Sequence, residues 1–383
     1  MVRNRITKYK SIISAFLEKK EAVVVIFLWI IIQAALIIFH GITTDGEAAR
    51  VIREANNLLN KEGLSATIYY LYLIEIILIV INIKVGLGFW LLVAFQLLLN
   101  AVALIKFKHF LEVFTQSKSI AYLGSLLLIL CFPYQQYNSY LYTESIFFSV
   151  SIIYSCLLLQ YKQIGLNESV LIIFFLLLLC ITRPSGIFFF AATCVYIFFL
   201  FSRSLGIGMK IILFFSLSTI TLVLVNFLMG LGGPIDILFP FKKQMIICDV
   251  STNILGAATY QIKTDNSIFG LFNYATRFPS DFLTLGWRRL GAFFGLTRPY
   301  YSFFHNSFLI LYFYTLYILI IVNLVRNIRR LPLTFIYLLS IIAIFGLSVI
   351  ASCDEWSNRF FLVLTPFLII SASYLFSKIP SVK

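Results

Sequence analysis

Two carboxylates lie one residue apart in the segment Asp45-Gly46-Glu47, directly after the first long apolar run of the chain. Such a pair could hold a divalent cation such as Mg²⁺ or Mn²⁺, or Asp45 could act as a general base. Thr44 and Glu47 also have the spacing of a helix capping box, and Gly63 is a helix stop signal. The segment therefore predicts either a catalytic or metal-binding pair or the capped start of a helix.

A third carboxylate, Glu144, lies in the stretch Tyr142-Thr143-Glu144-Ser145, where another apolar run begins. An ionisable group at the boundary of a membrane segment is a functional candidate by default. The alternative is a glutamate whose side chain reaches water at the bilayer surface, which costs little free energy. We count Glu144 as a candidate catalytic residue.

Two arginines stand at similar boundaries. Arg183 interrupts a long apolar run in Thr182-Arg183-Pro184-Ser185-Gly186, and Pro184 and Gly186 alone would account for a turn there. The turn does not require a guanidinium group, whose planar donors suit a lipid phosphate. Arg359 precedes the last apolar run. Ordinary contacts with lipid headgroups are the alternative for both arginines.

Other candidates lie near the ends of apolar runs. His40 and His305 are typical of interface residues, and we include His305 as a candidate substrate-binding residue. A set of basic residues could bind an anionic substrate or only solvate a long loop: Lys242, Lys243, Arg288, Arg289 and Arg298. Of these we select Arg298 as substrate-binding. The chain has no metalloprotease, serine-hydrolase, Walker or dinucleotide motif.

The composition of the chain indicates that these residues belong to a membrane protein. Of 383 residues, 61% are hydrophobic and 12% are charged, and the mean hydropathy is +0.96. A soluble protein of this length could not bury so much apolar surface. The net charge of +14 is scattered between apolar runs, so it favours topology signals over nucleic-acid binding. The six cysteines lack metal-ligand spacing, and we expect small buried apolar side chains without disulfides.

The sequence predicts an all-α polytopic membrane protein with one membrane domain, residues 1–383. The first apolar run is too long for a cleaved signal peptide, so we expect an anchor that stays in the membrane. About ten runs have the length and apolar character of crossings: 22–39, 88–105, 119–133, 145–160, 165–182, 186–201, 211–230, 307–325, 331–350 and 360–376.

The run Ala66 to Ile83 decides which side the later loops face. If it lies along the outer surface, the short inner loops carry eleven basic residues, namely Lys106, Lys108, Lys118, Lys162, Arg203, Lys210, Arg326, Arg329, Arg330, Lys378 and Lys383. The short outer connections then carry two, Arg183 and Arg359. This distribution obeys the positive-inside rule and predicts cytoplasmic N- and C-termini. Glu75 and neighbouring tyrosines also suit an interfacial or re-entrant helix.

This topology produces two long extracytoplasmic loops. Residues 41–87 form the first, with interfacial helices, and residues 232–306 form the second, with an expected amphipathic helix from Ser280 to Phe294. Both loops are too aromatic to be disordered, and long loops in compact proteins are usually functional when they are ordered. Almost all the acid and base chemistry available to the protein therefore lies at the outer face.

Together these motifs resemble the GT-C fold of integral-membrane glycosyltransferases. They are most similar to bacterial PIG-V-like mannosyltransferases, protein mannosyltransferases and aminoarabinose transferases. Asp45-Gly46-Glu47 resembles their modified D-x-D motif, with Glu in place of the second Asp. Tyr142 to Phe148, Thr182 to Gly186, and Asn358 to Phe361 followed by Pro366 resemble three further motifs in the same order. The region 232–306 departs from the resemblance.

The resemblance implies transfer of a sugar from a polyprenyl-phosphate donor to a glycan, lipid or protein acceptor at the outer face of a bacterial inner membrane. Asp45 would be the base or, with Glu47, hold a cation, and Glu144 would orient the sugar or acceptor. Arg183 and Arg359 would neutralise the leaving phosphate. A single base predicts inversion at the anomeric carbon. The alternatives are an O-antigen ligase or polymerase with pyrophosphate-linked donors, a transporter or flippase, and a non-catalytic scaffold.

Overall fold

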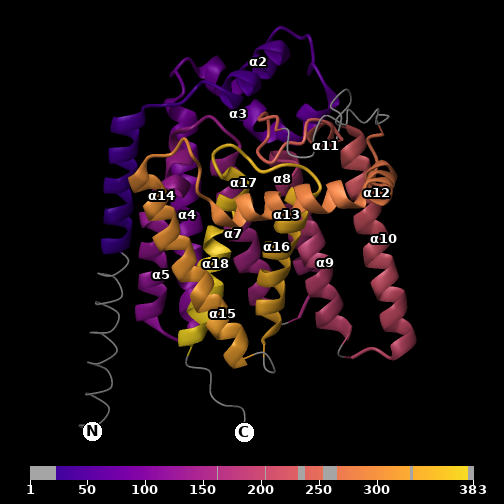
Figure 1. Ribbon diagram of the computed structural model, residues 1–383. Coiled ribbons are helices and arrows are strands. Elements are labelled where there is room, and N and C mark those ends of the chain that lie inside the picture. Colours follow the sequence, from indigo (N-terminus) through magenta and orange to yellow (C-terminus); the bar gives the residue numbers. More distant parts are fainter. Residues whose placement is uncertain are drawn as a thin grey trace, which may run out of the picture.

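The computed structural model describes residues 23–161, 163–202, 204–231, 238–252, 265–327 and 331–377. In these residues all regular structure is helical, and the extended pairing consists of two isolated bridges, Thr43 with Tyr140 and Ile247 with Asp354. The terminal segments whose cytoplasmic location the sequence predicts lie outside the described residues. The helices form an upright bundle, with further helices at the end drawn uppermost in Figure 1, which we call the upper end.

A first helix spans Val23–His40. The helices that follow are α2 (Glu47–Leu59), η1 (Thr67–Tyr72), α3 (Leu73–Val85), α4 (Trp90–Thr115), α5 (Lys118–Leu130), α6 (Phe132–Gln135), η2 (Gln136–Ser139), α7 (Glu144–Gln160), α8 (Leu166–Thr182), α9 (Gly186–Ser202), α10 (Ile207–Leu231), α11 (Phe239–Lys242), α12 (Ile268–Arg277), α13 (Pro279–Gly295), α14 (Phe303–Leu309), η3 (Ile310–Tyr314), α15 (Thr315–Asn327), α16 (Leu333–Ile350), α17 (Arg359–Leu362), α18 (Thr365–Ser373) and η5 (Tyr374–Phe376).

Several of these helices can span a bilayer. Six in the described residues are long and apolar enough to cross: Val23–His40, Thr67–Val85, Trp90–Thr115, Ile207–Leu231, Phe303–Asn327 and Leu333–Ile350. Shorter apolar helices coincide with other predicted crossings: Glu144–Gln160, Leu166–Thr182, Gly186–Ser202 and Thr365–Phe376. The chain is therefore an all-helical, multi-pass membrane protein in its described part, and the number of ten crossings stays a prediction.

One predicted crossing is not a single straight helix. The run 119–133 corresponds to α5, which ends at Leu130, and the chain then bends by 67° into the short helices that end at Ser139. Pro133 causes the break, because proline offers no N–H group and clashes with the preceding turn of a helix. The bend leads the chain directly to the start of α7.

The centre of the bundle is α7, whose residues are nearly all buried. It packs mainly against α4 and α8, and α18 is buried along its whole length beside α5 and α15. At the other extreme, α10 has no buried residue and stands at the edge of the bundle in Figure 1. A helix that is apolar all round and unburied faces lipid.

Two segments that the sequence assigns to the outer surface lie at the upper end. Thr67–Val85 is long and apolar enough to cross the bilayer, and Figure 1 places α3 beside α2, so its assignment as an interfacial helix stays a prediction. Glu75, which the sequence assigns to an interface, is fully buried within the structure. The amphipathic helix predicted from Ser280 to Phe294 is confirmed as α13, which runs across the bundle in Figure 1 with Trp287 exposed and Phe293 buried.

The expectation of no disulfide is wrong, because Cys248 and Cys353 are bonded to each other. They lie 105 residues apart, so no local spacing could have revealed the pair. The remaining cysteines, Cys131, Cys156, Cys180 and Cys194, are free and buried or half-buried, as the sequence predicts.

Candidate functional site

Four segments that are far apart in the sequence meet below α2. They are the first turn of α2 with Glu47, the first turn of α7 with Glu144, the turn between α8 and α9 with Arg183, and the first turn of α17 with Arg359. The contact with α2 places this cluster at the upper end of the bundle (Figure 1). The four motifs singled out in the sequence therefore form one site.

The turn that carries Arg183 depends on a close approach between two helices. The backbone at Arg183 is extended, which ends α8, and α9 begins at Gly186. A Cβ atom at Gly186 would lie 2.4 Å from the carbonyl carbon of Leu179, so only glycine fits there. The tight turn holds the guanidinium against the start of α7 and not in solvent.

Glu144 lies between the two arginines. Its Oε1 atom forms an ion pair with Arg183 and lies 3.3 Å from Nη1 of Arg359. The Glu144 side chain is fully buried and Arg183 is 5% exposed, so the interpretation of Glu144 as a glutamate that reaches water is wrong. Arg183 also donates to Thr143 Oγ1 at 3.4 Å and lies over the ring of Phe360.

Arg359 contacts three carboxylates. It forms ion pairs with Glu47 and Glu144, and its Nη2 atom donates to Glu355 Oε1 at 2.8 Å. Burial lowers the pKa of Arg359 to about 10. The site thus holds two guanidinium groups and three acidic side chains. Since each arginine is already paired, an incoming anion must take the place of a glutamate.

The capping-box interpretation of Glu47 is wrong. The N-cap of α2 is Gly46, with φ of 64°, and no side chain caps the helix. The Glu47 carboxylate instead turns toward Arg359. Gly63 does mark the end of this segment, since α2 ends at Leu59 and Gly63 has φ of +79°.

Asp45 lies two residues before Glu47, in the loop that leads into α2. Asp45 is exposed, and in the described part of the chain its carboxylate has neither an ion pair nor a hydrogen bond. The loop is held over the start of α7, because Leu141 N donates to Thr43 O at 3.1 Å and Tyr142 Oη donates to the Asp45 carbonyl at 3.1 Å. A free, exposed carboxylate held in a fixed position two residues before Glu47 is suited to accept a proton.

The pair Asp45 and Glu47 does not fit a resident Mg²⁺ or Mn²⁺ ion in this arrangement. The Glu47 carboxylate is used by Arg359, and within the described ranges no group of three His, Cys, Asp or Glu side chains could hold a metal ion. Mg²⁺ prefers oxygen ligands in octahedral geometry, which Asp45 alone does not supply. We therefore derive no step through a cation.

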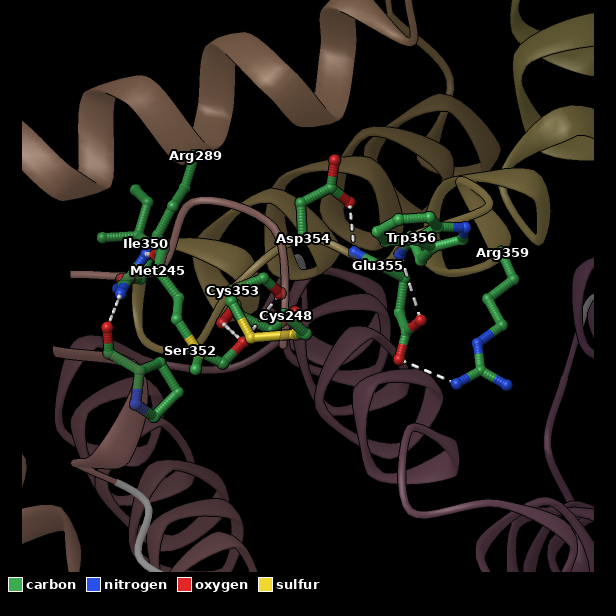
Figure 2. The surroundings of a disulfide bond; sticks show 12 residues. Met245, Cys248, Arg289, Ile350, Ser352, Cys353, Asp354, Glu355, Trp356 and Arg359 are labelled. Carbon is green, nitrogen blue, oxygen red and sulfur yellow. Dashed lines mark hydrogen bonds and ion pairs between the residues drawn. A yellow bond between two sulfur atoms is a disulfide. The ribbon is translucent and has the colours of Figure 1, made fainter. Parts of the chain in front are cut away.

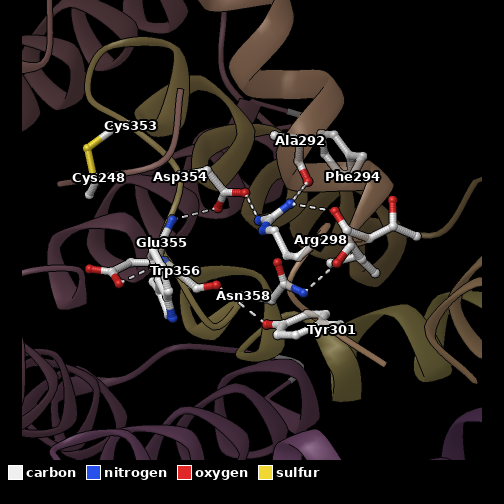
Figure 3. Close-up of polar contacts among 12 residues, drawn as sticks. Cys248, Ala292, Phe294, Arg298, Tyr301, Cys353, Asp354, Glu355, Trp356 and Asn358 are labelled. Atoms are coloured by element: carbon white, nitrogen blue, oxygen red, sulfur yellow. Dashed lines mark hydrogen bonds and ion pairs between the residues drawn. A yellow bond between two sulfur atoms is a disulfide. The ribbon is translucent and has the colours of Figure 1, made fainter. Parts of the chain in front are cut away.

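Two predicted substrate ligands have other surroundings. Arg298 is 2% exposed, forms an ion pair with Asp354 and donates to the carbonyl oxygens of Ala292 and Thr297, as Figure 3 shows. Both terminal nitrogens of Arg298 are used in this way and hold the loop before α17, so we no longer count it among the substrate ligands. His305 is half-buried on α14, and its ring stacks on that of Tyr301 with centroids 4.2 Å apart.

Sequence reasoning missed Glu355, which the structure places in the site. Burial raises its pKa to about 7; the charge of Arg183 opposes the shift and that of Glu144 adds to it. Burial likewise raises the pKa of Asp354 to about 6, although Arg298 lowers it. The signal available in the sequence was the acidic pair Asp354-Glu355, in which Glu355 lies four residues before Arg359.

No family model, curated protein or solved structure matches this chain. The chemistry of the site must therefore be argued from its own residues. Buried guanidinium groups bind phosphate or carboxylate oxygens with bidentate geometry, and an adjacent free carboxylate can remove a proton from a hydroxyl group. A cluster of this kind suits transfer of a group whose leaving portion is an anion.

Proposed function

We propose that this protein is an integral-membrane glycosyltransferase that moves a sugar from a polyprenyl-phosphate donor to a hydroxyl acceptor at the extracytoplasmic face of a bacterial inner membrane. One observation carries the proposal: buried Glu144 lies between Arg183 and Arg359, and Arg359 also pairs with Glu47, two residues after the exposed Asp45. These residues come from the motifs that resemble those of GT-C enzymes.

The proposed reaction is a direct displacement. The acceptor oxygen attacks the anomeric carbon, Asp45 takes the hydroxyl proton, and the bond between the anomeric carbon and the phosphate oxygen breaks. The electron pair leaves with the phosphate, whose charge Arg183 and Arg359 would stabilise after exchanging a glutamate for a phosphate oxygen. One displacement inverts the anomeric configuration.

The position of the site supports a lipid-linked donor. The arginines lie at the end of an apolar bundle, so a phosphate could reach them while its prenyl chain stays in the bilayer. The buried ion pairs at the ends of the described crossing helices lie at the start of α7 and at the turn between α8 and α9, and the break between α5 and α6 carries no charged residue. A transporter instead needs broken helices and ionisable residues near the middle of the bilayer.

The test is thermal stabilisation of the detergent-purified protein by three lipids: polyprenyl monophosphate, polyprenyl pyrophosphate and an anionic phospholipid. A ligand at about 100 times its Kd adds roughly 2.7 kcal/mol to the stability of the folded state. Arg183→Ala removes a site guanidinium, and Arg288→Ala is the matched control because Arg288 is an exposed cation on α13.

We expect stabilisation by the monophosphate that Arg183→Ala abolishes and Arg288→Ala retains. A preference for the pyrophosphate would favour a ligase or polymerase. An equal response to all three lipids would contradict a specific donor site. Retained anomeric configuration in a product would contradict the single displacement.

A further inference from the structure

The disulfide between Cys248 and Cys353 lies next to the candidate site. Figure 2 shows it in the loop that carries Asp354, Glu355, Trp356 and Arg359. Cys353 follows α16 by a short turn, and Glu355 is two residues further along. The bond therefore attaches the first part of the long loop to the segment that supplies two of the site's side chains.

The same junction is held by backbone hydrogen bonds. Asp354 N donates to Ile246 O at 2.8 Å, and Cys248 N donates to Asp354 O at 2.8 Å. These two bonds form the isolated bridge between Ile247 and Asp354. One residue, Asp354, is thus paired through its backbone on one side and through its carboxylate to Arg298 on the other.

A buried arginine joins the same two segments again. Arg289, fully buried in α13, donates to Met245 O at 2.8 Å and to Ile350 O at 2.9 Å. Met245 precedes Cys248, and Ile350 precedes Cys353. Figure 2 shows this contact on the opposite side of the disulfide from Arg359. The junction is therefore fixed covalently, by backbone pairing and by a side chain.

We propose that the Cys248–Cys353 disulfide is a positioning element of the site, which holds Glu355 and Arg359 where Arg359 meets Glu47 and Glu144. Reduction releases the loop 353–359, and the site loses this arrangement. The bond also requires that the upper end faces an oxidising compartment, because disulfides do not persist in the cytosol. This requirement agrees with the orientation predicted from the positive charges, on independent physical grounds.

The bond must first be shown to form. Alkylation of the denatured, unreduced protein should label the four free cysteines, and all six after reduction. Six reactive thiols in unreduced protein isolated from its membrane would overturn the proposal.

Hydrogen exchange then tests the positioning without any ligand. Reduced wild type and Cys353→Ser should exchange the amides of 354–362 and 245–250 about tenfold faster than oxidised wild type, while α7 and α18 stay protected. Reoxidation of the wild type should restore protection, which separates release of the loop from misfolding. Cys180→Ser, a free cysteine on α8, is the matched control. Unchanged exchange in 354–362 after reduction would overturn the proposal.

The effect on ligand binding rests on the proposed function. Reduction should abolish stabilisation by polyprenyl monophosphate in the wild type. Cys353→Ser, which cannot form the disulfide, should show no stabilisation by this lipid with or without reductant. If oxidised wild type does not respond to that lipid, the proposed function fails while the exchange experiment still decides the role of the disulfide. If the lipid stabilises reduced and oxidised protein equally, the positioning role is refuted.

Discussion

The pairing of Arg183 with Glu144 predicts strong energetic coupling between these two residues. Both are buried, so removing one leaves the other as a charge in an apolar environment. Breaking a buried pair costs about 3–5 kcal/mol. Arg359 lies 3.3 Å from Glu144 and still neutralises part of its charge when Arg183 is removed. We therefore expect Arg183→Met and Glu144→Gln each to cost about 3 kcal/mol, at the lower end of that range.

Removing both charges together should cost much less than the sum of the single changes. We expect a loss of about 1–3 kcal/mol for the double variant and hence a coupling energy of about 3–5 kcal/mol. The assay is equilibrium unfolding in mixed micelles, followed by tryptophan fluorescence, for the wild type and the three variants.

A second cycle provides the control. Lys108 and Glu112 on α4 form an i,i+4 pair at 3.8 Å near the surface, where coupling should be below about 0.5 kcal/mol. Single costs at Arg183 and Glu144 that add within about 0.5 kcal/mol would refute the reasoning, because additivity means that the two groups do not compensate each other's charge.

Three further predictions concern single residues. Asp45→Asn should leave stability within about 0.5 kcal/mol and donor-lipid stabilisation unchanged, but slow sugar transfer by about 10²–10⁴-fold; an unaffected rate would exclude Asp45 as the base. The Glu355 carboxyl has a pKa of about 7, above its usual 4.5, so the folded state loses stability as pH rises through this interval, by about 3 kcal/mol by pH 8. Glu355→Gln should remove this loss, and equilibrium unfolding of wild type and variant at pH 4.5 and at pH 8 checks it. Gly186→Ala should destabilise by about 1–3 kcal/mol, because its Cβ would meet Leu179, whereas Gly208→Ala, with open space, should cost nothing; equal melting temperatures would contradict the close approach.

Local sequence was enough to find the main members of the site. Glu144, Arg183 and Arg359 are charges at the ends of apolar runs, and the cost of burying charge marks such positions as functional or paired. The run from Ser280 to Phe294 was likewise readable as a helix, because its apolar residues follow helical spacing.

Other features depend on contacts between distant segments and leave no local pattern. The bond between Cys248 and Cys353 spans 105 residues, and Arg298 looks like any loop arginine until Asp354 folds against it. Glu47 had the spacing of a capping residue, but its carboxylate pairs with the guanidinium group of Arg359, a charge-assisted contact that is stronger than a bond to a neutral backbone amide. Tertiary electrostatics thus overrode a local helix signal.

The exposed helix α10 has a consequence for how the protein sits in a bilayer. Its 25 residues extend about 37 Å at 1.5 Å per residue, whereas the hydrocarbon core is about 30 Å thick. No side chain of α10 is fully buried, and the helix contacts the bundle mainly along α9, where Phe214 packs edge-to-face against Phe198. The mismatch in length must then be met by tilt or by local thickening of the bilayer, so the inclination of α10 should follow the thickness of the surrounding membrane.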